Sequence, residues 1–143
     1  MFDINLFSIT LIEDGKAPVD ITPGLVVEGN FYKLEKEQKE DTNVRLGARQ
    51  TAYTAVNSDN KSRILNIKYL PDSNAVKILN RIKKNNSKFG LAIVNASDPK
   101  YYANGSNCTI VEVPADEISQ KTGFSDYEYK IRIVDCDTDF PDA

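Results

Sequence analysis

SRILNIKYLPDSNAVKILNRIKK, residues 62–84, decides the fold because it contains a strand and a helix in succession. Residues 62–70 are typical of a β-strand, and Pro71 ends it because proline cannot donate a ladder hydrogen bond. Asp72-Ser73 then offers an N-cap, and Asn85-Asn86 can end the helix. Between them the apolar residues recur at helical spacing and form one stripe: Ala75, Ile78, Leu79 and Ile82. The sequence therefore predicts one short amphipathic helix directly after a strand.

The segment before this stretch predicts a β-hairpin over residues 4–30. Residues 4–13 alternate between apolar and polar side chains, as a half-buried strand does. Asp14-Gly15 follows and supplies the backbone angles of a type I′ turn. Pro23-Gly24 interrupts the return strand and suits a bend or bulge.

After the helix we expect three more strands, at residues 88–95, 107–113 and 127–134. Asn104-Gly105 is a second hairpin signal, placed just before the middle strand. The tail 135–143 is acidic, and we expect it to be loose.

Together these elements predict a mainly β fold with one helix (α+β), in a single domain spanning residues 1–143. About six or seven mostly antiparallel strands would form a β-sandwich or barrel, flanked by the amphipathic helix. A chain of 143 residues can bury a working core without disulfides. The sequence does not separate a sandwich from a barrel.

The composition offers few residues for catalysis or for metal binding. Histidine is absent, which removes the usual general base and the commonest transition-metal ligand. The two cysteines, Cys108 and Cys136, are too far apart for a zinc motif. A disulfide between them is the alternative, and in a reducing compartment we expect two buried thiols. The carboxylate pair Glu35 and Glu37 lies in a polar run, and we expect it on the solvated surface. We therefore expect no enzyme activity and no cofactor.

Charge and hydropathy indicate where the protein acts. A net charge of −3 argues against a nucleic-acid binder, because phosphate contacts need clustered Lys and Arg. No stretch approaches the roughly 20 apolar residues of a membrane span, and the first residues do not look like a signal peptide. We expect a protein made in a cytoplasm, with no membrane partner.

Residues 31–60 form a long polar excursion, which is uncommon inside a compact domain. Residues 33–41 are highly charged, and 57–61 is a turn cluster. Such segments are usually functional arms or disordered stretches. An alternative for 33–41 is a solvated helical turn with Glu–Lys pairs.

The middle of the chain resembles the phage tail tube proteins, whose fold is shared with the tube proteins of type VI secretion and contractile bacteriocins. The resemblance spans roughly residues 4–134, and Arg63 stands where glycine is common. Its motifs are Glu28-Gly29, the charged run to Asp41, Arg45-x-Gly47, the approach from Asn57 to Arg63, the strand to Leu70, and the helix start Asp72-Ser73-Asn74.

The resemblance implies a structural virion protein that forms hexameric rings, stacked into the tube through which DNA is ejected. Its partners would be copies of itself, a tape-measure protein, a baseplate initiator and, in a contractile tail, a sheath protein. DNA would pass without specific binding. The protein would reside in the virion tail, after assembly in the bacterial host cytoplasm.

The resemblance also assigns candidate site residues. The polar excursion at about residues 31–60 would be an assembly arm, and it would contact the neighbouring subunit or ring through Glu35, Glu37, Arg45, Gly47, Arg49 and Tyr53. Arg45 and Arg49 would pair with carboxylates across that interface, and Tyr53 would add apolar contact. The charged face of strand 127–134 would line the lumen with Glu128, Lys130 and Arg132, or would be an ordinary solvent face.

Two other functions remain open. One is a different tail component of the same fold, such as a tail terminator or a tube initiator. The other is a β-sandwich ligand-binding module, for which Tyr101-Tyr102 is the only aromatic candidate.

Overall fold

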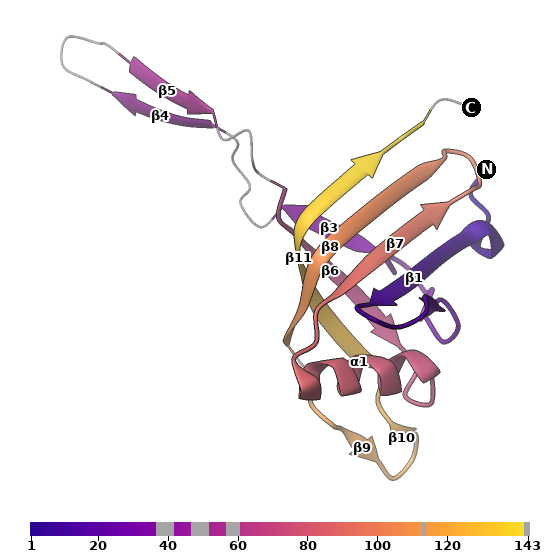
Figure 1. Ribbon diagram of the computed structural model, residues 1–143. Helices are drawn as coiled ribbons and strands as arrows, with labels where there is room; N and C mark the ends of the chain where they lie inside the picture. The colour runs from indigo at the N-terminus through magenta and orange to yellow at the C-terminus, as the bar shows by residue number, and fades with distance from the viewer. Residues whose placement is uncertain (37–41, 47–51, 57–60, 113, 142–143) are drawn as a thin grey trace.

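The computed structural model describes residues 1–36, 42–46, 52–56, 61–112 and 114–141; of 42–46 and 52–56 it describes only the backbone strands (Figure 1). Seven antiparallel strands form one sheet in the order β2-β1-β7-β8-β11-β6-β3. Their bounds are Phe7–Glu13 (β1), Val19–Asp20 (β2), Lys33–Lys36 (β3), Arg63–Tyr69 (β6), Phe89–Asn95 (β7), Tyr101–Glu112 (β8) and Tyr127–Asp139 (β11).

Two small hairpins and one α-helix complete the described fold. The strands Thr42–Leu46 (β4) and Ala52–Val56 (β5) pair with each other, and so do Ile118–Ser119 (β9) and Gly123–Phe124 (β10). The helix α1 spans Asn74–Asn85, and a 3-10 turn spans Ile4–Leu6 (η1). The predicted mainly β fold with one helix is confirmed.

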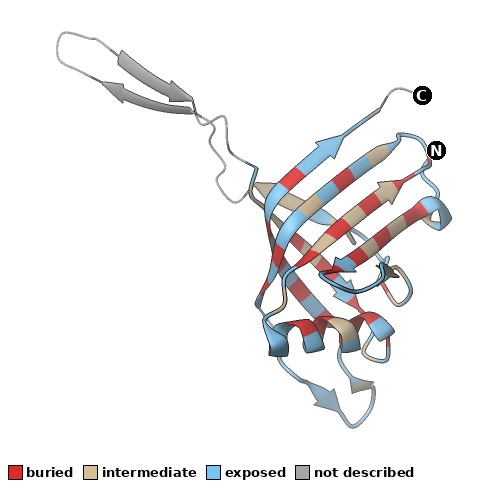
Figure 2. Cartoon of the chain, viewed as in Figure 1, coloured by how far each residue is buried: buried red, intermediate tan, exposed pale blue. Residues whose placement is uncertain are grey.

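The core lies on one face of the sheet, as the alternation in Figure 2 shows. In β1 every second residue from Phe7 to Glu13 is buried, and in β11 burial alternates from Tyr127 to Ile133. Period-two burial is what a strand with one solvated face requires.

The sheet is rolled but not closed. The segment 19–26 crosses between its two outer regions: the Ile21 amide donates to the Ile9 carbonyl (2.9 Å), and the Val26 amide donates to the Lys68 carbonyl (2.9 Å). The predicted hairpin is present, although its return strand is only the two residues of β2 and its first residues form η1. Gly24 makes the bend with φ +89°, an angle that favours glycine.

Helix α1 covers one end of the roll (Figure 1), and the predicted helix is confirmed. Its buried face consists of Ala75, Val76, Leu79 and Ile82, while the predicted Ile78 is half-buried. Asn86 ends the helix in the left-handed conformation at φ 52°. The Tyr129 hydroxyl donates to Asn80 Oδ1 at 2.8 Å and so joins α1 to β11.

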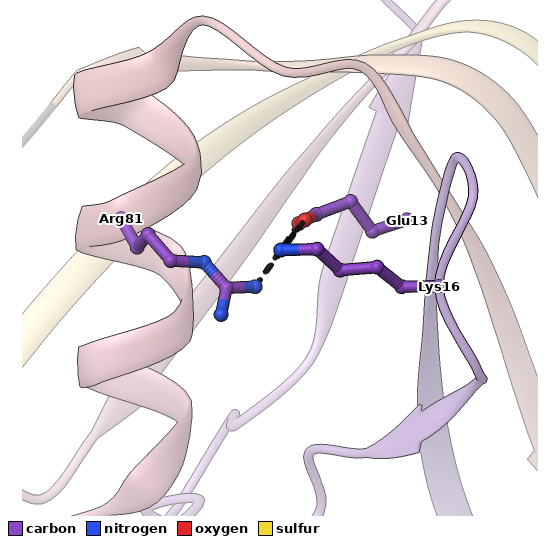
Figure 3. Close-up of polar contacts among 3 residues, drawn as sticks. All are labelled: Glu13, Lys16 and Arg81. Atoms are coloured by element: carbon purple, nitrogen blue, oxygen red, sulfur yellow. Dashed lines mark hydrogen bonds and ion pairs between the residues drawn. The ribbon is translucent and has the colours of Figure 1, made fainter.

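A charge cluster fastens α1 to the turn after β1 (Figure 3). The Glu13 side chain is 7% exposed, and its carboxylate lies 3.0 Å from both Lys16 Nζ and Arg81 Nη2. The hydrogen bond from Lys16 has the largest effect and, with the positive charge of Arg81, holds the pKa of Glu13 below its ordinary value against the effect of burial.

The hairpin predicted at Asn104-Gly105 is wrong, because β8 runs straight through these residues. Glycine is required at position 105 by close packing and not by a turn, because a Cβ there would lie 2.6 Å from Ile133 Cγ2. The prediction of a loose tail is also wrong up to Asp139. Pairing with β8 continues to that residue, and burial of Cys136 stabilises the extension.

The chain does not leave the main sheet at residue 31, where the predicted polar excursion begins, because β3 still pairs within the sheet up to Lys36. Phe31 and Tyr32 pack against the core, and β3 pairs with β6, with Lys36 opposite Arg63. The helical alternative is therefore wrong for residues 33–36. Beyond them, β4 and β5 form the separate hairpin that Figure 1 draws away from the main sheet.

Candidate assembly surfaces

The end of the roll opposite α1 carries an aromatic hollow of about 810 Å³, which we call the mouth. Strand ends from across the sheet and the two terminal segments bring its rings together. The rings of Phe7 and Phe31 have centroids 5.4 Å apart, and those of Tyr101 and Phe140 are 5.0 Å apart. The aromatic residues that line it are Phe2, Phe7, Phe31, Tyr32, Tyr101 and Phe140.

The mouth is apolar at its rim and polar at one point inside. Phe2 and Phe140 are 46% and 66% exposed, which is unusual for large apolar side chains placed together. The Tyr32 and Tyr101 hydroxyls lie 2.9 Å apart, and burial raises the pKa of Tyr32 far above its ordinary value. These phenols stay neutral and serve as hydrogen-bonding groups.

The described charged residues that line the mouth are all basic, although one of them, Lys33, is paired with Glu35. They are Lys33, Lys36 and Arg63, contributed by β3 and β6 at the rim. The mouth therefore favours a partner that is apolar at its centre and acidic at its edge.

A second apolar feature lies at the helix end of the molecule, on the β9–β10 hairpin (residues 116–126; Figure 1). Ile118 and Phe124 are directly opposite in the pairing and are 68% and 54% exposed. The Tyr127 hydroxyl donates to Asp116 Oδ1 at 2.8 Å and holds the base of the hairpin. Sequence reasoning missed this hairpin, although Gly123, which lies between the apolar residues Ile118 and Phe124, is a turn signal.

The outer face of β11 carries the predicted lumen residues Glu128, Lys130 and Arg132, all exposed on the side away from the core. Opposite charges face each other across the strands, with Glu128 paired to Lys68 and Lys130 paired to Glu112. The structure thus brings the three together on a face of mixed charge. A shallow groove of about 390 Å³ continues this face over β3 and β6.

Of the predicted arm residues, Glu35 lies in β3, 3.2 Å from Lys33 Nζ, and accepts a hydrogen bond from Asn66 Nδ2 (3.4 Å). Arg45 and Tyr53 are register partners in the β4–β5 hairpin. The remaining predicted residues, Glu37, Gly47 and Arg49, lie outside the described residues.

Chemical groups for catalysis are sparse in the part of the chain that the structure describes. Both cysteines are free and buried there, as predicted, and burial raises the pKa of Cys108 to about 12. Within the described ranges no group of three or more Cys, Asp or Glu side chains could hold a metal ion. In the same ranges, no helix is long and apolar enough to cross a membrane.

No protein-family model matches the chain, and no curated protein does either. Its fold is similar to that of a chain from the PVC sheath–tube complex, an extracellular contractile injection system in the extended state. The TM-score is 0.58 at 11% identity, over 99% of this chain and 93% of that one.

Two structures from the anti-feeding prophage (AFP) are similar as well. A chain of its tube-terminating cap matches with a TM-score of 0.55 at 11% identity, over 99% of this chain and 92% of that one. A chain of its baseplate matches with a TM-score of 0.55 at 10% identity, over 92% and 91%. At such identities the likeness concerns the fold, and it confirms the predicted resemblance: this chain has the tube-protein fold of contractile injection systems.

Proposed function

We propose that this protein is a structural subunit of a tail-tube-like assembly and that it works by associating with copies of itself. The observation that carries the proposal is the likeness to a chain of a sheath–tube complex over 99% of this chain. Two exposed apolar surfaces, the mouth and the β9–β10 hairpin, are consistent with a subunit whose partners are absent.

In its finer form the proposal is a phage tail tube built from stacked hexameric rings. Edge-to-edge strand pairing within a ring would cover the open edges of the rolled sheet. The tube would conduct DNA at ejection, contain a tape-measure protein during assembly, start from a baseplate initiator and carry a sheath in a contractile tail. The particle would be a virion tail assembled in the bacterial host cytoplasm.

Within such a tube the outer face of β11 suits a lumen. Alternating charges keep a water layer along the wall, and Glu128 between Lys68 and Lys130 prevents a continuous basic track for phosphate. The β4–β5 hairpin would be the arm that reaches a neighbouring subunit or ring, with Arg45 and Tyr53 at its centre.

A second candidate is a tail terminator or tube initiator of the same fold. The observation that favours it is the similar TM-score to a tube-terminating cap and to a baseplate chain. Such components form single rings, so they differ from a tube subunit in their stacking. A β-sandwich ligand-binding module remains the alternative outside this class, with the mouth as its binding site.

Negative-stain electron microscopy with sedimentation velocity, across a concentration series, tests the proposal. Hollow tubes of uniform width support the tube subunit, and rings that never stack support the terminator or initiator. A monomer at every concentration, with and without a crowding agent, overturns both and leaves the binding module.

A further inference from the structure

The two exposed apolar features of this chain lie at opposite ends of the molecule: the terminal segments, whose Phe2 and Phe140 line the mouth, are at one end, and the β9–β10 hairpin is at the other (Figure 1). The mouth is concave, and the β9–β10 hairpin projects beyond α1. A concave and a projecting surface on opposite ends of one chain can only meet between copies, and the resulting contact is heterologous.

The chemistry of the two features is complementary at the centre. The hairpin pairs only two residues of each strand, so it is too short to be stable in isolation. It nevertheless exposes Ile118 and Phe124 side by side. The mouth exposes Phe2 and Phe140 around a hollow large enough to admit such side chains. Burying both sets together would remove four large apolar side chains from water.

The chemistry is also complementary at the edges. Lys36 and Arg63 place two basic residues at the rim of the mouth, and a third, Lys33, is paired with Glu35. Residues 114–126, which contain the hairpin, carry three carboxylates and one lysine. Opposite charges around an apolar centre fix both the partner and its orientation.

We propose that successive copies stack by seating the β9–β10 hairpin of one copy in the aromatic mouth of the next. This inference rests on the proposed self-assembly and names the surfaces that carry it. Because the contact does not close on itself, a stack of any length keeps one unfilled mouth at one end and one free hairpin at the other, and it can grow from both ends.

The test uses two double variants of the full chain. The hairpin variant is Ile118→Thr with Phe124→Thr, and the mouth variant is Phe2→Ser with Phe140→Ser. All four positions are exposed in the single chain, so folding should survive, and circular dichroism checks this. The matched control is Ile12→Thr with Val134→Thr, two exposed apolar strand positions outside both features.

We expect the wild type and the control to stack at the same concentration. Each double variant should still form rings and should need a concentration higher by roughly tenfold or more to stack, since each lost apolar contact weakens the junction. Mixing the two variants, purified separately, should then restore one junction: intact hairpins of the mouth variant enter intact mouths of the hairpin variant. The mixture should give particles of two stacked rings, and stacking should stop there.

Several outcomes overturn the inference. If either variant forms tubes at the wild-type concentration, the inference is overturned and the proposed function stays intact. A mixture that stays at single rings shows that hairpins do not enter mouths, and double rings formed by either variant alone show that like surfaces meet like. Loss of stacking in the mouth variant alone shows that another segment, such as the arm, fills the mouth. A wild type that never assembles removes the proposed function itself, and is distinguished from the others by the absence of rings.

Discussion

The hydroxyl oxygens of Tyr32 and Tyr101 lie 2.9 Å apart although the residues are 69 positions apart in the chain. Tyr32 immediately precedes β3, and Tyr101 begins β8, so the bond connects the base of the polar excursion to the middle of the sheet. Their rings also meet edge to face, with centroids 6.0 Å apart. This pair fixes the start of β3 against the sheet.

Tyr32→Phe should destabilise the protein by about 1 kcal/mol, because it removes the hydrogen bond and leaves the Tyr101 hydroxyl without this partner. Urea denaturation followed by circular dichroism measures the change. The double variant Tyr32→Phe with Tyr101→Phe should cost less than the sum of the two single changes. Tyr102→Phe, at an exposed neighbour, serves as control, and strict additivity of the pair would contradict the prediction.

Gly24→Ala should destabilise the protein by roughly 2 kcal/mol or more, for two physical reasons. Gly24 has φ +89°, and an added Cβ would overlap the Cβ of Ser73 at the start of α1. Gly15→Ala is the matched control, because φ there is +78° but the space around it is open. The difference between the two free energies of unfolding isolates the overlap.

Replacing Ser73 with glycine in the Gly24→Ala background should recover part of the loss, since it removes the Cβ that the new methyl group meets. Equal destabilisation by Gly24→Ala and Gly15→Ala would show that backbone strain alone is responsible.

Glu13→Gln should reduce the dependence of stability on acidic pH. The pKa of Glu13 is lowered in the folded protein by Lys16 and Arg81, so its contribution is present above the unfolded value of 4.5 and is lost as pH falls through the lower folded value. Urea midpoints measured from pH 7 to pH 3 should fall more steeply for the wild type than for the variant. Parallel curves would show that the cluster in Figure 3 does not contribute to acid sensitivity.

Local patterns were sufficient for most of the fold. The alternation in β1, β6, β7 and β11 and the apolar stripe of α1 each lie in one continuous segment, so periodicity alone identifies them. Asn104-Gly105 misled because the dipeptide also fits a strand where Ile133 packs closely on Gly105, a contact that only the tertiary structure creates.

The candidate assembly surfaces were predictable only in part. Glu128, Lys130 and Arg132 alternate along one strand and were found from the sequence. The mouth was missed because its rings come from positions 2, 7, 31, 32, 101 and 140, which only the rolling of the sheet brings together. No local spacing encodes such a set.

Replacing residues 37–60 with a short Gly/Ser linker should leave a folded protein that forms no tubes. The linker can be short because Lys36 and Arg63 face each other across the β3–β6 pair. Since β3 pairs within the main sheet, the replacement has to begin after Lys36 and not within the strand. An unfolded variant by circular dichroism would contradict the prediction, and so would tubes of wild-type appearance.

Glu128→Lys should make assembled tubes retain DNA if the outer face of β11 lines the lumen. The change would place a third positive charge beside Lys68 and Lys130 and would attract phosphate along the wall. DNA added during assembly should then be protected from nuclease and released as salt is raised. Asp14→Lys, the same charge change on the exposed turn after β1, is the control and should give no protection. DNA that Glu128→Lys tubes bind but leave open to nuclease would place β11 on the outer wall, because a lumen encloses what it holds.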